Sequence, residues 1–255
     1  MMSHYNIFQA FFMSFYSRKL YLDVGKNWGG KTFLYLFLLL AVSWVGTTIH
    51  FQRSLNKGYA IESEAMLAQL PVLTVTDGVV STPENKPYFI TDPMTDKTFA
   101  IIDTTGKYTE LAAGENFLLI TPKKVITKQK KNETKIYDIP KDYTGTINPV
   151  TINGYISAFI GYTWIPFFFF CLIGSFIYRI LQALLYSLLG KLFSTVSNSN
   201  VSYGSILQIV MVALTPCITL STILDIFGCE FPKEYLTYFI ITMLYMIYGI
   251  RANKS

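Results

Sequence analysis

Formal charge, cysteine and histidine are all scarce in this chain of 255 residues. Charged residues make up only 15% of it, against about 25% in a typical soluble domain, whereas hydrophobic residues make up 51%. This balance argues against a disordered chain, a collagen, a coiled coil and a nucleic-acid-binding protein. The net charge of +5 is small, and so the positions of the charges carry more information than their sum.

The three cysteines and two histidines have no metal-ligand spacing. Cys171 and Cys217 lie in apolar runs, where a thiol usually packs as a small hydrophobe. The sequence contains no match to a Ser/His/Asp or Cys/His site, a P-loop or a Gly-rich dinucleotide turn. We therefore expect a protein that is not an enzyme and that holds no cofactor and no metal.

Most of the charge lies in one central block. Residues 52–150 carry 24 of the 37 charged side chains, half of them basic and half acidic. The regions on either side are nearly free of charge, which is typical of a membrane protein with one aqueous domain. Residues 32–52 form a run of 21 residues without charge, about the length of one membrane-spanning helix. Further spans are expected at about 154–177, 205–227 and 235–250.

Lysine and arginine in short loops indicate orientation. Placing the N-terminus, the 179–200 connection and the C-terminus in the cytoplasm puts eight flanking cations there, and leaves Arg53 and Lys57 outside. The expected domains are a cytoplasmic N-terminal interfacial helix (1–31), the first transmembrane helix (32–52), an extracytoplasmic β-rich domain (53–150) and a transmembrane bundle (151–255). Residues 180–196 leave three alternatives open: an interfacial helix, an extension of the second span, or an extra span.

Apolar residues of the N-terminal piece 5–22 recur at helical spacings of three and four. A helix lying on the inner membrane surface and a helix packed on the bundle are equally compatible with this pattern. In the central block a helix is expected over 59–70. Six strand candidates follow, at 72–76, 88–91, 98–103, 117–121, 124–127 and 135–139, and Asp77-Gly78 is a strong hairpin signal. The predicted fold is an α-helical membrane bundle of about four helices with a small extracytoplasmic antiparallel β-rich domain.

Two sets of residues are candidates for function. Pro166 and Pro216 fall within predicted spans and are expected to kink them, and Thr215 and Thr219 would form a polar face that serves helix packing or a substrate path. The second set is a run of lysines that could contact an anionic surface or a charged ligand, or could simply be a solvated hairpin: Lys123, Lys124, Lys128, Lys130, Lys131 and Lys135.

Ile101–Gly106 superficially resembles the Asp-Thr-Gly loop of aspartic proteases. A second threonine separates Asp103 from Gly106, and the second carboxylate that this chemistry needs has no matching motif. A strand that ends in a turn is the simpler interpretation.

Several segments together resemble an uncharacterised family of bacterial multi-pass membrane proteins, domain of unknown function 1189. The segments are Phe11–Ser17, Leu20–Val24, Trp28, Gly30-Lys31, Tyr35–Leu39, Gln69–Pro71 with Asp77-Gly78, Ile102–Gly106 and Ala213–Pro216. The resemblance implies a bacterial inner-membrane protein and transfers no catalytic residue.

The leading hypothesis is a non-enzymatic inner-membrane protein whose periplasmic domain binds a partner or an envelope component. Its expected partners are the lipid bilayer and a membrane protein or a second copy of the chain, and not nucleic acid. A transporter or transporter accessory subunit is the alternative, and it predicts a polar cavity near Pro166, Thr215 and Thr219. A membrane enzyme is the third class, and it would need clustered ionisable residues at the interface.

Overall fold

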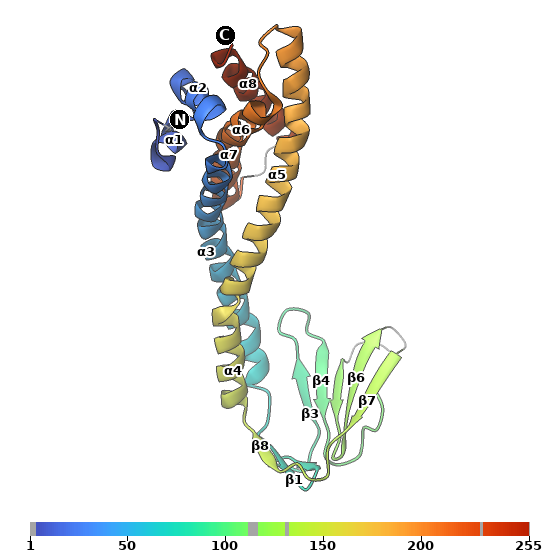
Figure 1. Cartoon of the computed structure of the whole chain (residues 1–255). Coiled ribbons are helices and arrows are strands. Elements are labelled where there is room, and N and C mark those ends of the chain that lie inside the picture. The colour runs from blue at the N-terminus through green and yellow to red at the C-terminus, as the bar shows by residue number, and fades with distance from the viewer. Residues whose placement is uncertain (1–3, 112–116, 131–132, 230–231, 255) are drawn as a thin grey trace. The chain divides into compact units, whose positions relative to one another are not determined.

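The computed structural model describes residues 4–111, 117–130, 133–229 and 232–254. The chain forms two compact units (Figure 1). One, the helical unit, combines Met1–Phe51 with Trp164–Ser255, and the other, the two-sheet unit, is Gln52–Thr163. Each unit has its own buried core.

The helical unit begins with two short helices, α1 (Ile7–Met13) and α2 (Arg18–Asn27). Its long helices are the first part of α3 (Lys31–Leu67) and the whole of α5 (Trp164–Val196). It is completed by α6 (Tyr203–Ala213), α7 (Thr215–Phe227) and α8 (Glu234–Ala252).

Side-chain contacts show which helices of this unit run in the same direction. The Tyr35 and Thr215 hydroxyls are 2.7 Å apart. A Cβ built on Gly46, eleven residues further along α3, would lie 2.8 Å from Ile226, eleven residues further along α7. Hence α3 and α7 run parallel.

Helix α5 runs against α3, because its aromatic partners occur in reverse order. Phe37 packs on Phe176 and Phe51 stacks on Phe167, with ring centroids 5.4 and 3.9 Å apart. Such alternation of direction is expected of successive membrane crossings.

Four helical segments are long and apolar enough to cross a membrane: Lys31–Leu67, Pro149–Val196, Tyr203–Phe227 and Glu234–Ala252. The coarse prediction of about four spans is therefore confirmed. Of the alternatives for residues 180–196, the structure shows an extension of the second helix, because α5 continues without a break to Val196. Arg179 consequently lies inside α5 rather than in the connection after a span, which corrects its predicted place.

A one-residue interruption of the helix lies just before each of the two prolines. Helix α4 (Pro149–Tyr162) ends one residue before Thr163, and Pro166 is the third residue of α5. Helix α6 ends at Ala213, and after Leu214 helix α7 begins at Thr215 with Pro216 as its second residue. A proline lacks a backbone N–H and its ring crowds the carbonyl four residues earlier, so the preceding turn opens.

The N-terminal piece divides into two helices instead of forming one, because Ser17 caps α2 through its side chain. Leu20, Tyr21 and Val24 of α2 are fully buried in the bundle. Phe8 and Phe12 of α1 are 81% and 67% exposed. Helix α2 thus packs on the bundle, as one of the two interpretations predicts, whereas α1 keeps Phe8 and Phe12 uncovered, and its position on the inner membrane surface stays a prediction.

In the two-sheet unit, the later part of α3 pairs with α4. Gln52 donates a hydrogen bond to the Ile160 carbonyl over 2.9 Å, and the Tyr59 hydroxyl bonds to Asn153. The two segments therefore run antiparallel. Helix α3 continues past the predicted end at residue 52, because Arg53 and Lys57 end the apolar run but are good helix formers.

The strands of this unit are β1 (Leu73–Thr76), β2 (Val79–Ser81), β3 (Tyr88–Thr91), β4 (Thr98–Ile102), β5 (Leu118–Ile120), β6 (Lys124–Lys130), β7 (Glu133–Asp138) and β8 (Gly145–Ile147). They form two sheets, ordered β2-β1-β8 and β3-β4-β5-β6-β7. The prediction of an antiparallel domain needs correction here, because β4 and β5 pair in parallel. The other strand pairs are antiparallel.

Strand β4 supplies both faces of the larger sheet with buried residues. Ala100 and Ile102 join the core that includes β1 and β2, whereas Ile101 packs with Leu119 and Ile126 on the other face. Successive side chains of a strand point to opposite faces, and so three consecutive buried residues place β4 inside the domain. Gln69, just after α3, pins this region by exchanging hydrogen bonds of 2.8 and 3.0 Å with the Thr91 backbone.

The turn between β1 and β2 yields a first prediction. Gly78 has φ +74°, and a Cβ on it would lie 2.7 Å from the Pro140 carbonyl oxygen. Gly106 has φ +82°, but a Cβ on it would meet no atom within 4 Å. Since the left-handed backbone costs a non-glycine residue about 1–2 kcal/mol, Gly106→Ala measures that strain alone. Gly78→Ala adds the clash with the backbone, and we expect it to lower the free energy of unfolding at least about twice as much.

Hydrogen exchange of the slowest amides of β4 in the full-length protein measures both free energies. Equal losses in the two variants would contradict the close approach at Gly78.

Candidate functional site

The polar residues near Pro216 bond to one another inside the helical unit. Thr215 and Tyr35 are at most 1% exposed and share a 2.7 Å hydrogen bond. The Cys217 thiol lies 3.1 Å from the Thr242 hydroxyl and donates to the Tyr238 carbonyl over 3.1 Å. These bonds join α7 to α3 and to α8. Thr215 and Cys217 therefore fasten helices together, as small polar residues commonly do in membrane bundles.

The remaining candidates of this set do not join that cluster. The Thr219 hydroxyl is buried without a partner among the described residues. Pro166 lies exposed in the first turn of α5. The polar cavity that the transporter alternative predicts thus finds no support at Thr215, which is fully packed, or at Pro166, which faces outward.

A buried carboxylate holds the N-terminal segment of the helical unit. Asp23 in α2 is 4% exposed, and it accepts hydrogen bonds from Asn27 Nδ2 at 2.7 Å, Trp28 Nε1 at 2.9 Å and the His4 backbone N–H at 3.1 Å. Burial alone would raise the pKa of this carboxyl, but the hydrogen bonds from Asn27, Trp28 and His4 outweigh it and hold the pKa below its usual value. Asp23 stays ionised and acts as a clamp.

Sequence reasoning counted Asp23 only as a charge. The sequence did contain a signal for these hydrogen bonds: Asn27 and Trp28 follow Asp23 by four and five residues, at the end of the same helix. Lys31 adds a second fastening, because its ammonium donates to the Tyr5 carbonyl and lies 4.6 Å from the Trp28 ring centroid.

The Asp103 carboxylate in the two-sheet unit is also saturated with donors. It is fully buried at the end of β4 and accepts from the Thr105 hydroxyl at 2.6 Å, the Thr105 N–H at 2.9 Å and the Tyr108 N–H at 2.6 Å. Burial alone would raise the pKa of this carboxyl, but the hydrogen bonds lower the pKa by more than burial raises it. The pKa therefore lies below its usual value. The interpretation of this motif as a strand that ends in a turn is confirmed.

The lysine run borders an open cleft in the two-sheet unit. The cleft has a volume of about 780 Å³ and is lined by Asp77, Gly78, Val79, Lys123, Lys124, Asp138, Ile139, Pro140 and Lys141. Three backbone hydrogen bonds hold its walls together: Val80 N–H to Pro122 O at 2.7 Å, Gly78 N–H to Tyr143 O at 3.0 Å and Ile139 N–H to Lys123 O at 3.0 Å. The first bond joins β2 to the residue two positions before β6, the second joins the β1–β2 turn to the segment between β7 and β8, and the third closes the base of the β6–β7 hairpin.

The structure divides the lysine run instead of gathering it into one patch. Lys123 and Lys124 line the cleft, where Asp138 is the cross-strand partner of Lys124. Lys128 and Lys130 lie further along β6, and Lys135 lies on β7. Lys131 falls outside the described residues. The cleft therefore offers both ammonium and carboxylate groups, and not a purely cationic surface.

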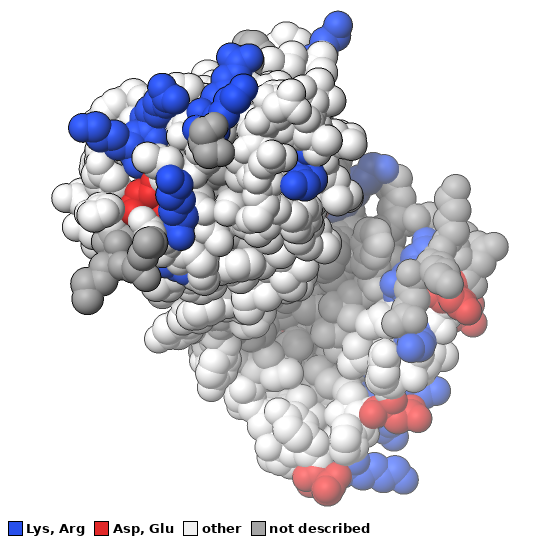
Figure 2. Space-filling view, turned by 45° about the horizontal axis from the view of Figure 1, so that its top comes forward, with Lys and Arg blue, Asp and Glu red and all other residues white. Residues whose placement is uncertain are grey.

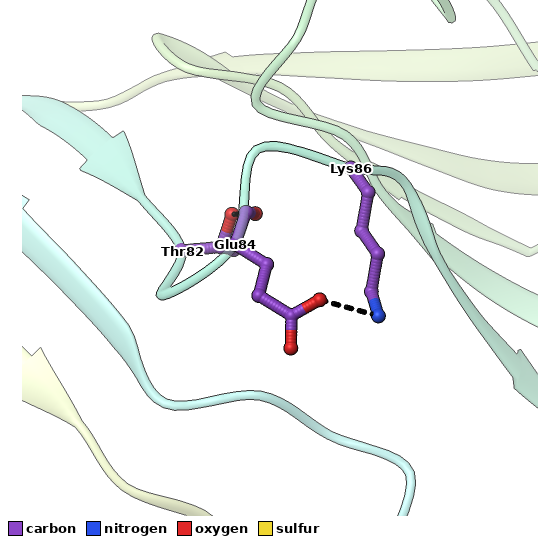
Figure 3. A network of polar contacts seen from close by, with 3 residues as sticks. All are labelled: Thr82, Glu84 and Lys86. Carbon is purple, nitrogen blue, oxygen red and sulfur yellow. Dashed lines mark hydrogen bonds and ion pairs between the residues drawn. The ribbon is translucent and has the colours of Figure 1, made fainter.

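On the face that Figure 2 shows, the two-sheet unit carries both signs of charge. The one ion pair within 4.0 Å among the described residues joins Lys86 to Glu84 over 2.6 Å, beside Thr82, whose hydroxyl donates to the Glu84 carbonyl (Figure 3). Both charged side chains are more than half exposed. An exposed pair of this kind contributes about 0–1 kcal/mol, so the pair stabilises a loop without marking a site.

The part of the chain that the structure describes contains no cluster of side chains that could support metal or acid–base chemistry. Among the described residues, no group of three or more His, Cys, Asp or Glu side chains could hold a metal ion. The two buried carboxylates belong to different units and are both fully hydrogen-bonded. The mixed-charge cleft is therefore the best candidate for a binding site.

The clamp at Asp23 generates a pH prediction. Because its folded-state pKa lies below the usual 3.8, the stabilisation that Asp23 provides is complete above the usual value and is lost as the pH falls through the lower folded value. We expect Asp23→Asn to lower the free energy of unfolding at pH 7 by about 1.5–3 kcal/mol, as for a lost hydrogen bond to a charged group. Thermal unfolding in detergent, followed by tryptophan fluorescence, measures the loss.

The difference between wild type and Asp23→Asn should shrink below about pH 4. A difference that stays constant down to pH 3 would show that the charge of Asp23 does not act as a clamp.

Comparison with known proteins places the chain in a family. The profile of a family described as "Protein of unknown function (DUF1189)" matches residues 8–250. No curated protein and no solved structure matches the chain. Because the matched segment takes in both units and nearly the whole sequence, the resemblance seen in the sequence is confirmed, and the chain belongs to the DUF1189 family of proteins of unknown function.

Proposed function

We propose that this protein is a non-enzymatic component of the bacterial inner membrane whose two-sheet unit binds a partner or an envelope component in the periplasm. The single observation that carries the proposal is the mixed-charge cleft, which has a volume of about 780 Å³ and is lined by three lysines and two aspartates. The four candidate spans indicate a membrane protein, and the proposal adds its orientation and its role.

The distribution of cations supports the orientation. Exposed cations gather at the end of the helical unit where α2, the end of α5 and the end of α8 meet. Arg18 donates to the Arg251 carbonyl over 3.5 Å, and Lys254 donates to the Ser197 carbonyl over 3.1 Å. Such a cluster favours the cytoplasmic side. Residues 53–150, which follow the first predicted span (32–52), would then lie in the periplasm.

The form of the cleft supports a binding role. Its volume is within the range of about 300–1,000 Å³ that small-molecule sites occupy. It carries three lysines and two aspartates on a frame held by backbone hydrogen bonds. A ligand that presents both signs of charge, such as a peptide segment, matches this lining best.

The interior of the helical unit supports an anchoring role for the bundle. Tyr35, Thr215, Cys217 and Thr242 direct their polar atoms at one another and not at an aqueous path. A bundle fastened in this way holds the two-sheet unit at the membrane.

Native Cys229 tests the orientation. It is exposed just after α7, whereas Cys217 is buried. With a periplasmic 228–234 loop, we expect a membrane-impermeant maleimide to label wild-type protein in spheroplasts and to label Cys229→Ser much less.

Lys254→Cys in the Cys229→Ser background is the matched control from the other end of the helical unit, and it should react only after permeabilisation. Labelling of Lys254→Cys, but not of Cys229, in sealed spheroplasts would overturn the proposed orientation.

The cleft is tested by a photo-crosslinking amino acid placed at Val79, which lines it. We expect a discrete adduct in cells, absent when the same amino acid replaces Met94, which is exposed in the turn after β3 and lies outside the cleft. Reversing two charges with Lys123→Glu and Lys124→Glu should lower the adduct yield about tenfold, since each exposed charge contributes up to about 1 kcal/mol.

Lys135→Glu reverses a lysine of the same run that does not line the cleft, and it should leave the yield unchanged. Equal losses from Lys135→Glu and from the double reversal would show that net charge, and not the cleft, governs binding.

A further inference from the structure

Helix α1 is held at both ends and uncovered on one face: Ala10 is buried in the bundle core, whereas Phe8 and Phe12 are exposed. Before it, the Tyr5 carbonyl accepts from Lys31, and after it the Phe15 and Tyr16 carbonyls accept from Tyr245 and Tyr248 over 3.1 and 2.9 Å. Its first turn is closed by a capping box between Asn6 and Gln9. The chain thus fixes a short helix in place while it leaves Phe8 and Phe12 uncovered.

An apolar groove separates α1 from α3. It measures about 330 Å³, exposes no polar surface, and is lined by Ile7, Phe8, Phe11 and Phe12 from α1 and by Tyr35, Leu38, Leu39 and Val42 from α3. The α3 residues recur at spacings of three and four, and so they form one stripe along the helix. Val42 is 75% exposed in this structure. The end of the groove that lies farthest from Lys31 along α3 is therefore uncovered.

Seven cations gather at one end of the helical unit, and one of them, Lys31, contacts the chain at the start of this helix. The basic end comprises Arg18, Lys19, Lys26, Lys31, Lys191, Arg251 and Lys254, and the single acid among them is Asp23. Asp23 is buried and saturated by N–H donors. The exposed charged side chains at this end are therefore all positive. The hydrogen bond from Lys31 to the Tyr5 carbonyl connects the basic end to the start of α1.

The stretch of α3 from Lys31 to the last residue that lines the groove, Val42, is about as long as one leaflet of a bilayer is thick. Lys31 begins α3 and Val42 lies three turns further along, a rise of about 16 Å at 1.5 Å per residue. Half of a hydrocarbon core of about 30 Å is about 15 Å. A chain that begins at the basic end and lies along this stripe would therefore reach the middle of the membrane.

We propose that the groove between α1 and α3 holds an acyl chain of an anionic phospholipid whose headgroup lies at the basic end. The absence of polar lining in the groove fits a hydrocarbon chain better than a peptide, which brings backbone groups that need partners. The cluster of cations selects a negative headgroup over a zwitterionic one. The inference is independent of any ligand of the two-sheet unit.

Native mass spectrometry of the full-length protein in mild detergent tests this site. The probes are synthetic phosphatidylglycerol and phosphatidylcholine with identical acyl chains. We expect one phosphatidylglycerol to remain bound at concentrations where phosphatidylcholine does not. Replacing both Lys19 and Lys26 by Gln should reduce this preference, by up to about fivefold for each cation near the headgroup. Equal binding of the two lipids by the wild-type protein would overturn the proposal without any variant.

Leu38→Trp tests the groove itself, because the larger side chain fills it. We expect the bound lipid to be lost from Leu38→Trp and kept by Val45→Trp, the matched control at an exposed position of the same helix that does not line the groove. The two variants are compared only as monodisperse samples with wild-type melting temperatures. Retention of phosphatidylglycerol by Leu38→Trp at the wild-type level would place the lipid elsewhere and overturn the proposal.

Discussion

The hydrocarbon interior of a bilayer tolerates neither unpaired backbone polar groups nor unpaired charge, and the helical unit follows from that constraint. Helices satisfy the backbone, and the two prolines interrupt them. At the second interruption Leu214 still donates to the Val210 carbonyl, and the Thr215 hydroxyl next to it meets Tyr35. The break in the third span thus becomes the point where α3 and α7 are fastened together.

The same constraint explains where the charges lie. With few charges allowed among the spans, the cations collect at one end of the helical unit, where the N-terminal helices and the end of α8 meet. One carboxylate, Asp23, remains among them because N–H donors saturate it. Figure 2 shows this contrast on one face of the molecule, with blue side chains gathered on the helical unit and both signs on the two-sheet unit. The proposed orientation and the proposed lipid site both depend on this asymmetry.

Local signals predicted what local chemistry determines. The four spans follow from apolar runs, and the β1–β2 turn follows from Asp77-Gly78, whose φ values are both positive. The parallel pairing of β4 with β5 was not predictable, because it joins strands across a long loop and depends on the core around Ile101 and Leu119. Strands β2 and β8 are three residues long and leave almost no pattern. The cleft was missed for a related reason: Lys123, Asp77 and Lys141 are distant in sequence and meet only through tertiary hydrogen bonds.

The central claim is that the basic end of the helical unit and the chain between the first two spans lie on opposite sides of the membrane. Protease treatment of sealed spheroplasts carrying a tag after Ser255 tests it most directly. The account predicts that cleavage within residues 68–148 leaves a protected fragment that keeps its C-terminal tag. Loss of the tag from an otherwise intact chain would contradict the account.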